Sequence, residues 1–258
     1  MLKVENLKVH YPIRGGFFNT IKDHVYAVDG VDIEIESGKT YGLIGESGSG
    51  KSTIIKLILG LNSNYAGSIK YDTFDIDTIP ANKMSKIATL ITNDSYLVQG
   101  SIRSHLSVNK HITEEDMYNA LEKVNLKDFV IENGGLDYQL SCGASNLSGG
   151  QKQRLLAAKA ILKDSYIYIL DEAVSNIDDY SKKIVLDAFD SIKNGKIIVV
   201  ISHDLETITN SDNIYVLKDK QIIEEGTHEQ LIDKPSLYKK LFNDQQQLKE
   251  KFLAKEVE

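Results

Sequence analysis

One nine-residue stretch, Gly45-Glu46-Ser47-Gly48-Ser49-Gly50-Lys51-Ser52-Thr53, constrains the fold of this chain more than any other feature. It follows a short apolar segment, Tyr41–Ile44, and precedes a second one, Ile54–Leu59, that ends at Gly60. The pattern G-x-x-x-x-G-K-[ST] between a strand and a helix is typical of a loop that cradles phosphate groups. Because glycines let several backbone N–H groups converge on one anion at the start of a helix, the sequence predicts a strand–loop–helix unit here.

The side chains of this loop indicate which anion it holds. Lys51 is placed to reach the β- and γ-phosphates of a nucleotide, and the hydroxyl of Ser52 is placed to bind Mg²⁺. The other loop positions predicted to surround the phosphates are Gly45, Ser47, Gly48, Ser49, Gly50 and Thr53. The sequence therefore predicts a site for a nucleoside triphosphate with Mg²⁺, but it does not say what the energy is used for.

Composition limits the classes of protein that remain. The chain has 258 residues, of which 26% are charged and 41% hydrophobic, so it can bury a full core as one large domain or two small ones. A net charge of −7 gives little support to nucleic-acid binding. The single cysteine, Cys142, excludes an intramolecular disulfide and any cysteine metal cluster, and it fits a reducing compartment. No apolar run approaches the roughly 20 residues of a membrane-spanning helix, so work at a membrane needs a partner that crosses it.

The order of apolar patterns predicts an α/β protein. Val31, Ile33 and Ile35 alternate with acidic residues, which indicates antiparallel β structure in the first forty residues. The fully apolar runs at 166–170 and 197–201 are typical of buried parallel strands, and the helical pattern between them predicts a sheet covered on both faces. Helices are predicted for residues 54–59, 114–130, 151–163, 180–192 and 244–258, the last of them a solvated polar helix.

Two further motifs carry chemistry. Leu147-Ser148-Gly149-Gly150-Gln151-Lys152-Gln153-Arg154 opens a predicted helix, and its serine and glycines form a second anion-binding surface at that helix start. The stretch 166–172 ends in Asp171 and Glu172 after a run of apolar residues. The carboxyl end of a strand is the usual ligand position in an open α/β sheet. Asp171 can hold Mg²⁺ there through water, and Glu172 can polarise an attacking water.

These three motifs, in this order, resemble the ATP-binding cassette, which is the nucleotide-binding domain of ABC transporters. The resemblance covers the chain from Met1 to about Leu241. It implies an α/β fold with a P-loop NTPase core around a parallel sheet, an N-terminal antiparallel β subdomain and an inserted α-helical subdomain at about 94–160. The ATPase domain would then occupy residues 1–243, and residues 244–258 would form a polar C-terminal helix or tail.

The resemblance also implies roles for individual residues in ATP hydrolysis. Glu172 matches the catalytic base, and Lys51 matches the lysine that contacts the phosphates. His203 matches the switch histidine that contacts the γ-phosphate, although a lone histidine at a strand end is ordinarily a bystander. Asp171 matches the acid that assists Mg²⁺. Tyr11 matches the aromatic residue that stacks on adenine, and a core position on an edge strand is its other interpretation.

The resemblance further implies a dimer with ATP and Mg²⁺ buried between two cassettes. Ser148 and Gly150 would act in trans and cap the ATP that lies on the phosphate loop of the other cassette. Asp178 matches the acid of a segment, Ser175-Asn176-Ile177-Asp178, that crosses the dimer interface. The two cassettes would be arranged head to tail, as a homodimer or a heterodimer.

Two positions depart from the family pattern. Asn93 stands where exporter-type members carry a glutamine that reaches Mg²⁺ and the attacking water. Its amide sits on a stem one carbon shorter, so a water-bridged contact is open while direct ligation is in doubt. Cys142 stands where exporters carry a glutamate that touches the transmembrane coupling helix, and a cysteine cannot make that charge contact.

The function that the resemblance implies is the ATP-hydrolysing subunit of an ABC transporter, bound peripherally at the cytoplasmic face of the membrane. The start at Met1 favours a separate transmembrane permease over an excised domain. Residues 11–18 are similar to peptide importers, whereas residues 93–106 and 224–229 are similar to exporters, so the direction of transport stays open. The alternatives are a soluble ABC ATPase that acts on ribosomes or DNA and a regulatory cassette that scarcely hydrolyses ATP.

Overall fold

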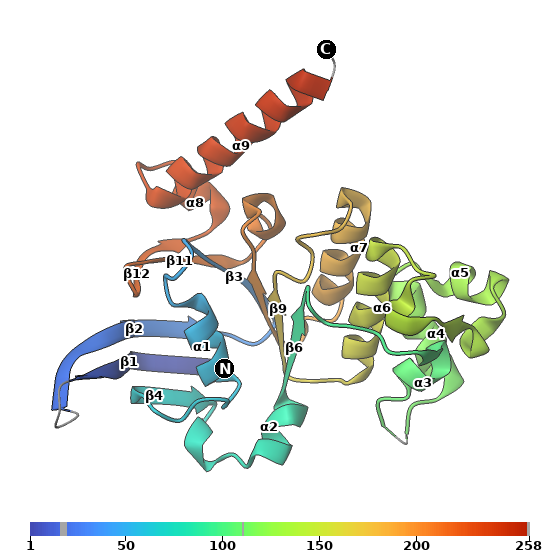
Figure 1. Ribbon diagram of the computed structural model, residues 1–258, viewed down its shortest axis with the longest axis horizontal. Helices are drawn as coiled ribbons and strands as arrows, with labels where there is room; N and C mark the ends of the chain where they lie inside the picture. Colours follow the sequence, from blue (N-terminus) through green and yellow to red (C-terminus); the bar gives the residue numbers. More distant parts are fainter. Residues whose placement is uncertain (16–19, 110, 257–258) are drawn as a thin grey trace. The chain divides into compact units, whose positions relative to one another are not determined.

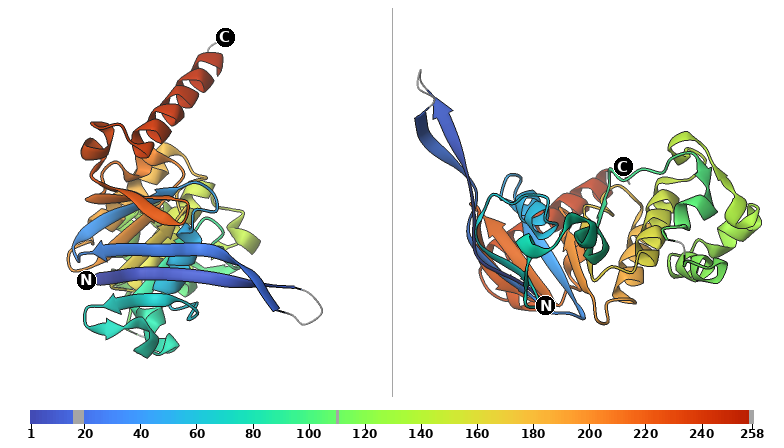
Figure 2. Two further views of the ribbon diagram at one scale, coloured as in Figure 1. Left: turned by 90° about the vertical axis from the view of Figure 1, so that its left-hand side faces the viewer. Right: turned by 90° about the horizontal axis from the view of Figure 1, so that it is seen from below.

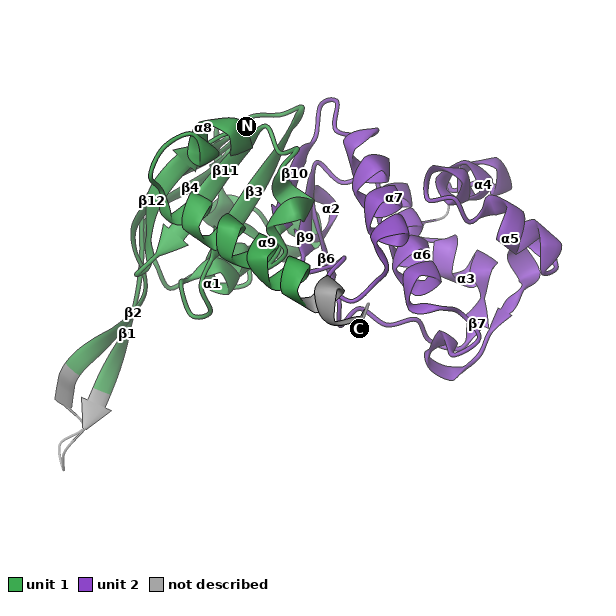
Figure 3. Cartoon of the chain, turned by 90° about the horizontal axis from the view of Figure 1, so that it is seen from above, with its two compact units in different colours: residues 1–84, 201–258 green, residues 85–200 purple. Residues whose placement is uncertain are grey.

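The computed structural model describes residues 1–15, 20–109 and 111–256. The chain divides into two compact units, Met1–Met84 with Ile201–Glu258 and Ser85–Val200, shown in green and purple in Figure 3. Residues 16–18 of the importer-like stretch and residues 257–258 of the predicted tail lie outside the described residues. Both units combine strands with helices, which confirms the α/β prediction.

The first unit contains an antiparallel sheet built on a long hairpin, which Figure 2 shows from two sides. Its strands, in sheet order, are β2 (Thr20–Ile35), β1 (Leu2–Gly15), β4 (Ala66–Tyr71) and β5 (Phe74–Asp75). The side chains of Val31, Ile33 and Ile35 are at most 4% exposed, as the alternating pattern predicts. The predicted N-terminal antiparallel region is therefore confirmed.

The first unit also holds the strands that position the phosphate loop. These strands are β3 (Lys39–Gly45), β11 (Asn213–Lys218) and β12 (Gln221–Gly226). The helices of this unit are α1 (Lys51–Ile58), α8 (His228–Ile232) and α9 (Leu237–Glu256), with the 3₁₀ turns η1 (Ile76–Thr78) and η4 (Leu205–Ile208). Strand β11 pairs in parallel with β3 and antiparallel with β12. Tyr41, Leu43 and Ile44 of β3 are buried, so the strand that ends at Gly45 is fixed in the core.

The second unit combines buried parallel strands with a group of helices. Its strands are β6 (Ala88–Thr92), β7 (Gly100–Ser101), β8 (Gln139–Leu140), β9 (Ile167–Asp171) and β10 (Ile197–Ile201, whose last residue is assigned to the first unit). Its helices are α3 (Ile102–Leu106), α4 (Glu114–Lys123), α5 (Lys127–Glu132), α6 (Gly149–Leu162) and α7 (Asp179–Asp190), with 3₁₀ turns η2 (Gly135–Asp137) and η3 (Cys142–Ala144); α2 (Ala81–Ile87) crosses the boundary between the units. Strand β6 pairs in parallel with β9. The predicted strand at 197–201 is thus confirmed, and the one predicted at 166–170 is confirmed one residue later, because Tyr166 is 69% exposed and lies before β9.

The prediction of one helix over residues 114–130 is wrong, because the chain forms two helices there. The break lies at Asn125, whose φ of 51° is left-handed, and asparagine accepts this conformation more readily than most residues. Arg154 donates a hydrogen bond from Nη1 to the Asn125 carbonyl oxygen at 2.8 Å. Val124 and Leu126 are nonetheless both buried, so the apolar pattern continues through the break and hides it.

The C-terminal helix α9 begins well before the polar tail. It starts at Leu237, so residues 244–256 belong to the same helix as residues 237–243, as Figure 1 shows in red. Within the described part of the chain, no helix, α9 included, combines the length and the apolar character needed to cross a bilayer.

Candidate functional site

The phosphate loop joins β3 to α1 within the first unit, and its glycines are required by its geometry. Gly48 has a φ of 76° and Gly50 a φ of 113°, conformations that side chains disfavour. A Cβ atom at Gly50 would lie 2.6 Å from the carbonyl oxygen of Ala27 on β2. A Cβ atom at Gly45 would overlap with the carbonyl oxygen of Leu217 on β11. The neighbouring strands therefore allow only glycine at these two positions.

The polar groups of the loop suit a polyphosphate. Lys51 is 8% exposed, and its Nζ donates hydrogen bonds to the carbonyl oxygens of Gly45 and, at 3.1 Å, of Glu46, so the ammonium folds back over the loop. The buried Ser49 hydroxyl has no hydrogen-bond partner among the described residues. The first turn of α1 adds amide donors and the positive end of the helix dipole. These residues fit the triphosphate of ATP.

Lys220 is a basic side chain near the loop that the sequence analysis missed. It lies in the tight turn between β11 and β12, with a left-handed φ of 71°. Its Nζ donates to the carbonyl oxygen of Gly48 at 2.5 Å, and its own carbonyl oxygen accepts a hydrogen bond from Asp29 at 3.0 Å. The only signal in the sequence is the polar pair Asp219-Lys220 between two strands, which marks a hairpin turn but not its neighbour.

Tyr11, the predicted adenine partner, lies on β1 opposite Val25 of β2. It is 41% exposed, and its hydroxyl accepts a hydrogen bond from Nδ2 of Asn62 at 3.0 Å. The same strand β2 carries Ala27, which touches Gly50 of the phosphate loop. Tyr11 is therefore an exposed aromatic residue rather than a core residue. It lies on β1, which pairs with β2, and β2 borders the phosphate loop.

In the second unit, the acid pair Asp171 and Glu172 lies at the carboxyl end of the parallel strand β9. Strand β9 is buried up to its last residue, Asp171, which lies opposite Thr92 of β6. Asn93 follows Thr92 directly, so the amide departure and the acid pair lie at the same edge of the sheet. Gln153 of α6 approaches the Asn93 carbonyl oxygen at 3.5 Å, the outer limit of a hydrogen bond.

Glu172 has an unusual backbone conformation. Its φ of 52° lies in the left-handed region, where a residue other than glycine is strained by roughly 1–3 kcal/mol. Its carbonyl oxygen accepts hydrogen bonds from both the N–H and the hydroxyl of Ser175, at 3.1 and 2.9 Å. This turn holds the strained residue in place directly after Asp171.

The signature motif forms the start of α6, and Ser148 is its N-cap. The Ser148 hydroxyl accepts a hydrogen bond from the N–H of Gln151 at 3.1 Å, while the Gln151 side chain accepts one from the N–H of Ser148 at 2.8 Å. Ser148 and Gly149 are exposed. The motif therefore presents a capped helix start with its own hydrogen bonds satisfied at the surface of the second unit.

Gly150 of the signature packs against the residue predicted to cross the dimer interface. A Cβ atom at Gly150 would overlap with the Ser181 hydroxyl and would lie 2.8 Å from a carboxylate oxygen of Asp178. Asp178 caps α7 by accepting a hydrogen bond from the N–H of Ser181 at 2.8 Å, and the hydrogen bonds from Ser181 lower the pKa of this carboxyl. The structure thus brings Ser148, Gly150 and Asp178 together at the starts of α6 and α7.

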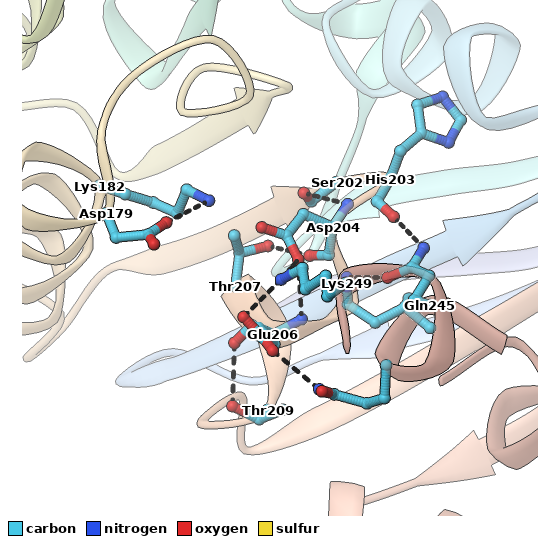
Figure 4. A network of polar contacts seen from close by, with 12 residues as sticks. Asp179, Lys182, Ser202, His203, Asp204, Glu206, Thr207, Thr209, Gln245 and Lys249 are labelled. Carbon is cyan, nitrogen blue, oxygen red and sulfur yellow. Dashed lines mark hydrogen bonds and ion pairs between the residues drawn. The ribbon is translucent and has the colours of Figure 1, made fainter. Parts of the chain in front are cut away.

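His203 follows β10 and belongs to the first unit, as the phosphate loop does. Ser202 before it is buried and accepts a hydrogen bond from the N–H of Asp204 at 3.0 Å. The carbonyl oxygen of His203 accepts a hydrogen bond from the side chain of Gln245 on α9 (Figure 4). The site residues predicted from the sequence thus fall into two sets. The first unit holds the phosphate loop and His203, and the second unit holds the acid pair and the signature motif.

The second unit also contains a cavity of about 590 Å³ beside Asn93, which the sequence analysis did not foresee. Tyr96, 80% exposed, lines it together with His105, Lys159 and Lys163. Burial lowers the pKa of Lys163, and nearby Lys159 lowers it further. Burial also lowers the pKa of His105. The other lining residues are Thr89, Leu90, Ile91, Asp94, Ser95, Ser104, Ser107, Val108, Leu156 and Ala160.

Comparisons with known proteins identify the family of the chain. Residues 28–175 match the ABC transporter family. The chain is 39% identical over 225 residues to an uncharacterized ABC transporter ATP-binding protein of Haemophilus influenzae, covering 87% of this chain and 40% of that protein. It is 37% identical over 224 residues to an ATP-dependent lipid A-core flippase of Saccharophagus degradans, covering 85% of this chain and 38% of the flippase.

The fold agrees as well. A bacterial Atm1-family ABC exporter with ATP bound matches 95% of this chain with a TM-score of 0.82 and 26% identity, over 42% of the exporter chain. The chain therefore belongs to the ABC transporter family. It corresponds to the ATP-binding, ATP-hydrolysing part of that family, and it spans about two fifths of the length of these relatives.

Proposed function

We propose that this chain binds ATP with Mg²⁺, hydrolyses it in a head-to-tail dimer of cassettes and thereby drives an exporter-type transmembrane permease. The observation that carries the proposal is the conformation of Glu172. A strained carboxylate residue that follows a buried strand and is held by two hydrogen bonds from Ser175 is typical of a functional position. The phosphate loop of the same chain supplies the binding half of the reaction.

Binding rests on residues of the first unit. The backbone of Gly45–Thr53 and the start of α1 hold the phosphates, and Lys51 places its ammonium against the β- and γ-phosphates. The exposed aromatic ring of Tyr11 suits stacking on the adenine. When Mg²⁺ is bound, the hydroxyl of Ser52 would be one of its ligands and the carboxylate of Asp171 another, and the amide of Asn93 would reach it through water. This set of few protein oxygens matches Mg²⁺, which keeps several waters and phosphate ligands.

Hydrolysis rests on positioning and on charge neutralisation. Glu172 accepts a proton from the attacking water and orients it. His203 contacts the γ-phosphate and stabilises the charge that develops on it. Mg²⁺, when bound, neutralises charge on the phosphate oxygens. The turn at Ser175 holds the backbone of this base directly after β9.

Dimerisation supplies the remaining donors. The start of α6, which is exposed at Ser148 and Gly149, would offer the Ser148 hydroxyl and the backbone before the buried Gly150 to the ATP held by a second cassette. Asp178 lies against Gly150, so a shift of this helix start would also move Asp178, which would contact the other subunit. The partner cassette is either a second copy of this chain or a related one.

The cavity beside Asn93 supports a membrane partner. It is lined by the exposed Tyr96, by Lys159 of α6 and by Lys163 at the C-cap of α6. Asp94, which also lines it, directly follows Asn93, the residue at the position of the family's link between ATP and permease. Because burial disfavours the charge of Lys163, an acidic group from the partner would stabilise it there. The exporter and flippase relatives favour export as the direction.

The test of the proposed function is the substitution Glu172→Gln, which removes the base but keeps the shape of the side chain. We expect steady-state ATP hydrolysis to fall at least about 100-fold, while ATP affinity stays within about threefold and an ATP-bound dimer accumulates on size exclusion. The control is Glu132→Gln, an exposed glutamate at the end of α5. Hydrolysis at the wild-type rate in Glu172→Gln would contradict the assignment of the base.

A further inference from the structure

Helix α9 carries a stripe of four residues on one face, at positions 238, 242, 245 and 249. Their spacings of four, three and four residues place them one above the other on a helix. The first two, Tyr238 and Phe242, are aromatic, whereas Gln245 and Lys249 are polar. The helix therefore has an aromatic half and a polar half along the same line.

The aromatic half fixes α9 to the rest of the first unit. Tyr238 is fully buried, and its hydroxyl makes a 2.7 Å hydrogen bond with Nδ1 of His228 on α8. The Phe242 ring lies 5.0 Å from the His228 ring and 6.1 Å from the Tyr238 ring. Glu224 of β12 accepts hydrogen bonds from the first two N–H groups of α9, at 2.5 and 3.0 Å. The start of α9 is thus anchored from two sides, and the direction of its polar half is set.

The polar half meets the chain around His203, and Gln245 bridges the backbone on both sides of Asp204. The Gln245 Nε2 donates to the carbonyl oxygen of His203, and its Oε1 accepts from the N–H of Leu205 at 3.0 Å. Figure 4 shows this amide beside the His203 carbonyl, while the imidazole points away from it. One side chain therefore fixes the carbonyl of one residue and the N–H of the residue two positions later.

Two neighbours of Gln245 hold the same segment by its acidic side chains. Lys249 lies 3.2 Å from the carboxylate of Asp204 and 2.6 Å from that of Glu206. Gln246 donates to Glu206 at 2.8 Å. Burial alone would lower the pKa of Lys249, but its hydrogen bonds to Glu206 and Asp204 outweigh burial and raise it. Every residue from His203 to Glu206 is thereby contacted by α9.

We propose that Gln245 is a positioning residue for His203: by bridging the backbone of residues 203 and 205, it sets the direction in which the imidazole reaches the γ-phosphate. This inference rests on the proposed role of His203. The direction of a side chain follows the backbone dihedrals of its own residue, and the segment after β10 is a turn without strand pairing to fix them. A catalytic contact displaced by about 1 Å can lose much of its effect.

The polar contacts between α9 and residues 203–206, unlike the aromatic anchor of α9, are poorly suited to a purely stabilising role. Lys249 is 42% exposed and Glu206 is 48% exposed, and exposed ion pairs contribute about 0–1 kcal/mol to the free energy of unfolding. A structural function would show as a lower unfolding midpoint with hydrolysis kept. A positioning function would show as lost turnover with the unfolding midpoint kept.

The test uses the full chain with Gln245→Ala, and with Gln247→Ala as the matched control, because Gln247 is an exposed glutamine of the same helix. We expect the kcat for ATP hydrolysis to fall about tenfold in Gln245→Ala with KM within twofold, and no change in Gln247→Ala. The ratio of ATP to ADP affinity, measured by calorimetry in the Glu172→Gln background, should fall about fivefold, because only ATP has the γ-phosphate. Unchanged kcat and unchanged affinity ratio in Gln245→Ala would overturn the inference.

A double-mutant cycle separates this inference from the proposed function. If Gln245 acts through His203, the Gln245→Ala change should cost nothing further in a His203→Ala chain. A full tenfold additional loss in that background would overturn the inference while leaving the proposed function intact. Wild-type turnover in His203→Ala alone would instead overturn the assignment of His203, and the inference with it.

Discussion

The phosphate loop and the segment around His203 belong to the same unit of the molecule but are held in opposite ways. The loop is shaped by its own glycines, by α1 directly after it and by the close approach of the β2 and β11 backbones. The His203 segment has a local hydrogen bond between Ser202 and Asp204, and it is also held by side chains about forty residues later in the chain, on α9. One part of the site is therefore shaped by backbone geometry, and the other depends in addition on remote side chains.

This difference indicates which substitutions the phosphate loop and the His203 segment can each tolerate. Backbone contacts survive most side-chain substitutions elsewhere, so ATP binding should be insensitive to changes in α9. Side-chain bridges are lost with a single substitution, so the response to the γ-phosphate should be sensitive to them. Binding and hydrolysis should accordingly be separable by mutation within one unit.

The largest effect is expected from Gly50→Ala, which attacks the local geometry of the loop. A methyl group there would lie 2.6 Å from the Ala27 carbonyl oxygen, and the alanine would have to adopt the φ of 113° that Gly50 has. The strain of such a residue is of the order of 1–3 kcal/mol before the overlap is counted. We expect ATP affinity, measured by calorimetry, to fall at least about 100-fold.

Gly48→Ala is the matched control for Gly50→Ala. It lies in the same loop with a φ of 76°, but a Cβ atom there would meet nothing within 4 Å. It should lose no more than about tenfold in affinity, because strain is present without overlap. Equal losses in the two variants would show that the close approach of β2 does not shape the loop.

A smaller effect is expected from Phe242→Ala, which loosens the remote support of the His203 segment. The ring contacts both His228 and Tyr238, and each aromatic pair contributes roughly 0.5–1.5 kcal/mol. We expect the free energy of unfolding to fall by about 1–3 kcal/mol in denaturant titrations and ATP hydrolysis to fall about fivefold. ATP affinity should stay unchanged, because the loop does not depend on α9.

The control for Phe242→Ala is Leu248→Ala, a residue of the same helix that is 54% exposed. It should change neither hydrolysis nor stability by a measurable amount. A loss of ATP affinity in Phe242→Ala as large as its loss of hydrolysis would contradict the separation of the two parts.

The same difference explains how much the sequence could predict. The phosphate loop is encoded in nine consecutive residues, and the Ser148 cap is encoded in Ser148 and Gln151, so both are visible in the sequence. The acid pair is visible because Asp171 ends an apolar strand. These parts are recognisable because their chemical groups are close together in the sequence, although the close approach of β2 and β11 to the loop is not visible in it.

The support of His203 could not be predicted, because polar residues do not indicate their partners. Gln245 and Lys249 lie in a stretch with the composition of a solvated helix, and nothing in it specifies a carbonyl group 42 residues away. The break at Asn125 was hidden for a different reason, since buried residues on both sides continue the helical pattern. Tertiary contacts decided both features.

Lys220 is the exception to the comparison, because it is a remote side chain that touches the loop. Replacing it with glycine should act on stability and binding in opposite directions. Glycine relieves the left-handed φ of 71°, which should raise the free energy of unfolding by about 0.5–1 kcal/mol. Loss of the ammonium beside the Gly48 carbonyl oxygen should weaken ATP binding about threefold, a modest effect because the group is partly exposed.

Asp219→Gly provides the matched control for Lys220→Gly within the same turn. Its φ of 48° is also left-handed, but among the described residues its exposed side chain makes no hydrogen bond or ion pair with the phosphate loop. It should therefore gain stability without losing ATP affinity. If both variants bind ATP as the wild type does, the phosphate loop needs no remote side chain, unlike the His203 segment. If Lys220→Gly alone loses affinity, the loop is supported by one remote side chain, that of Lys220.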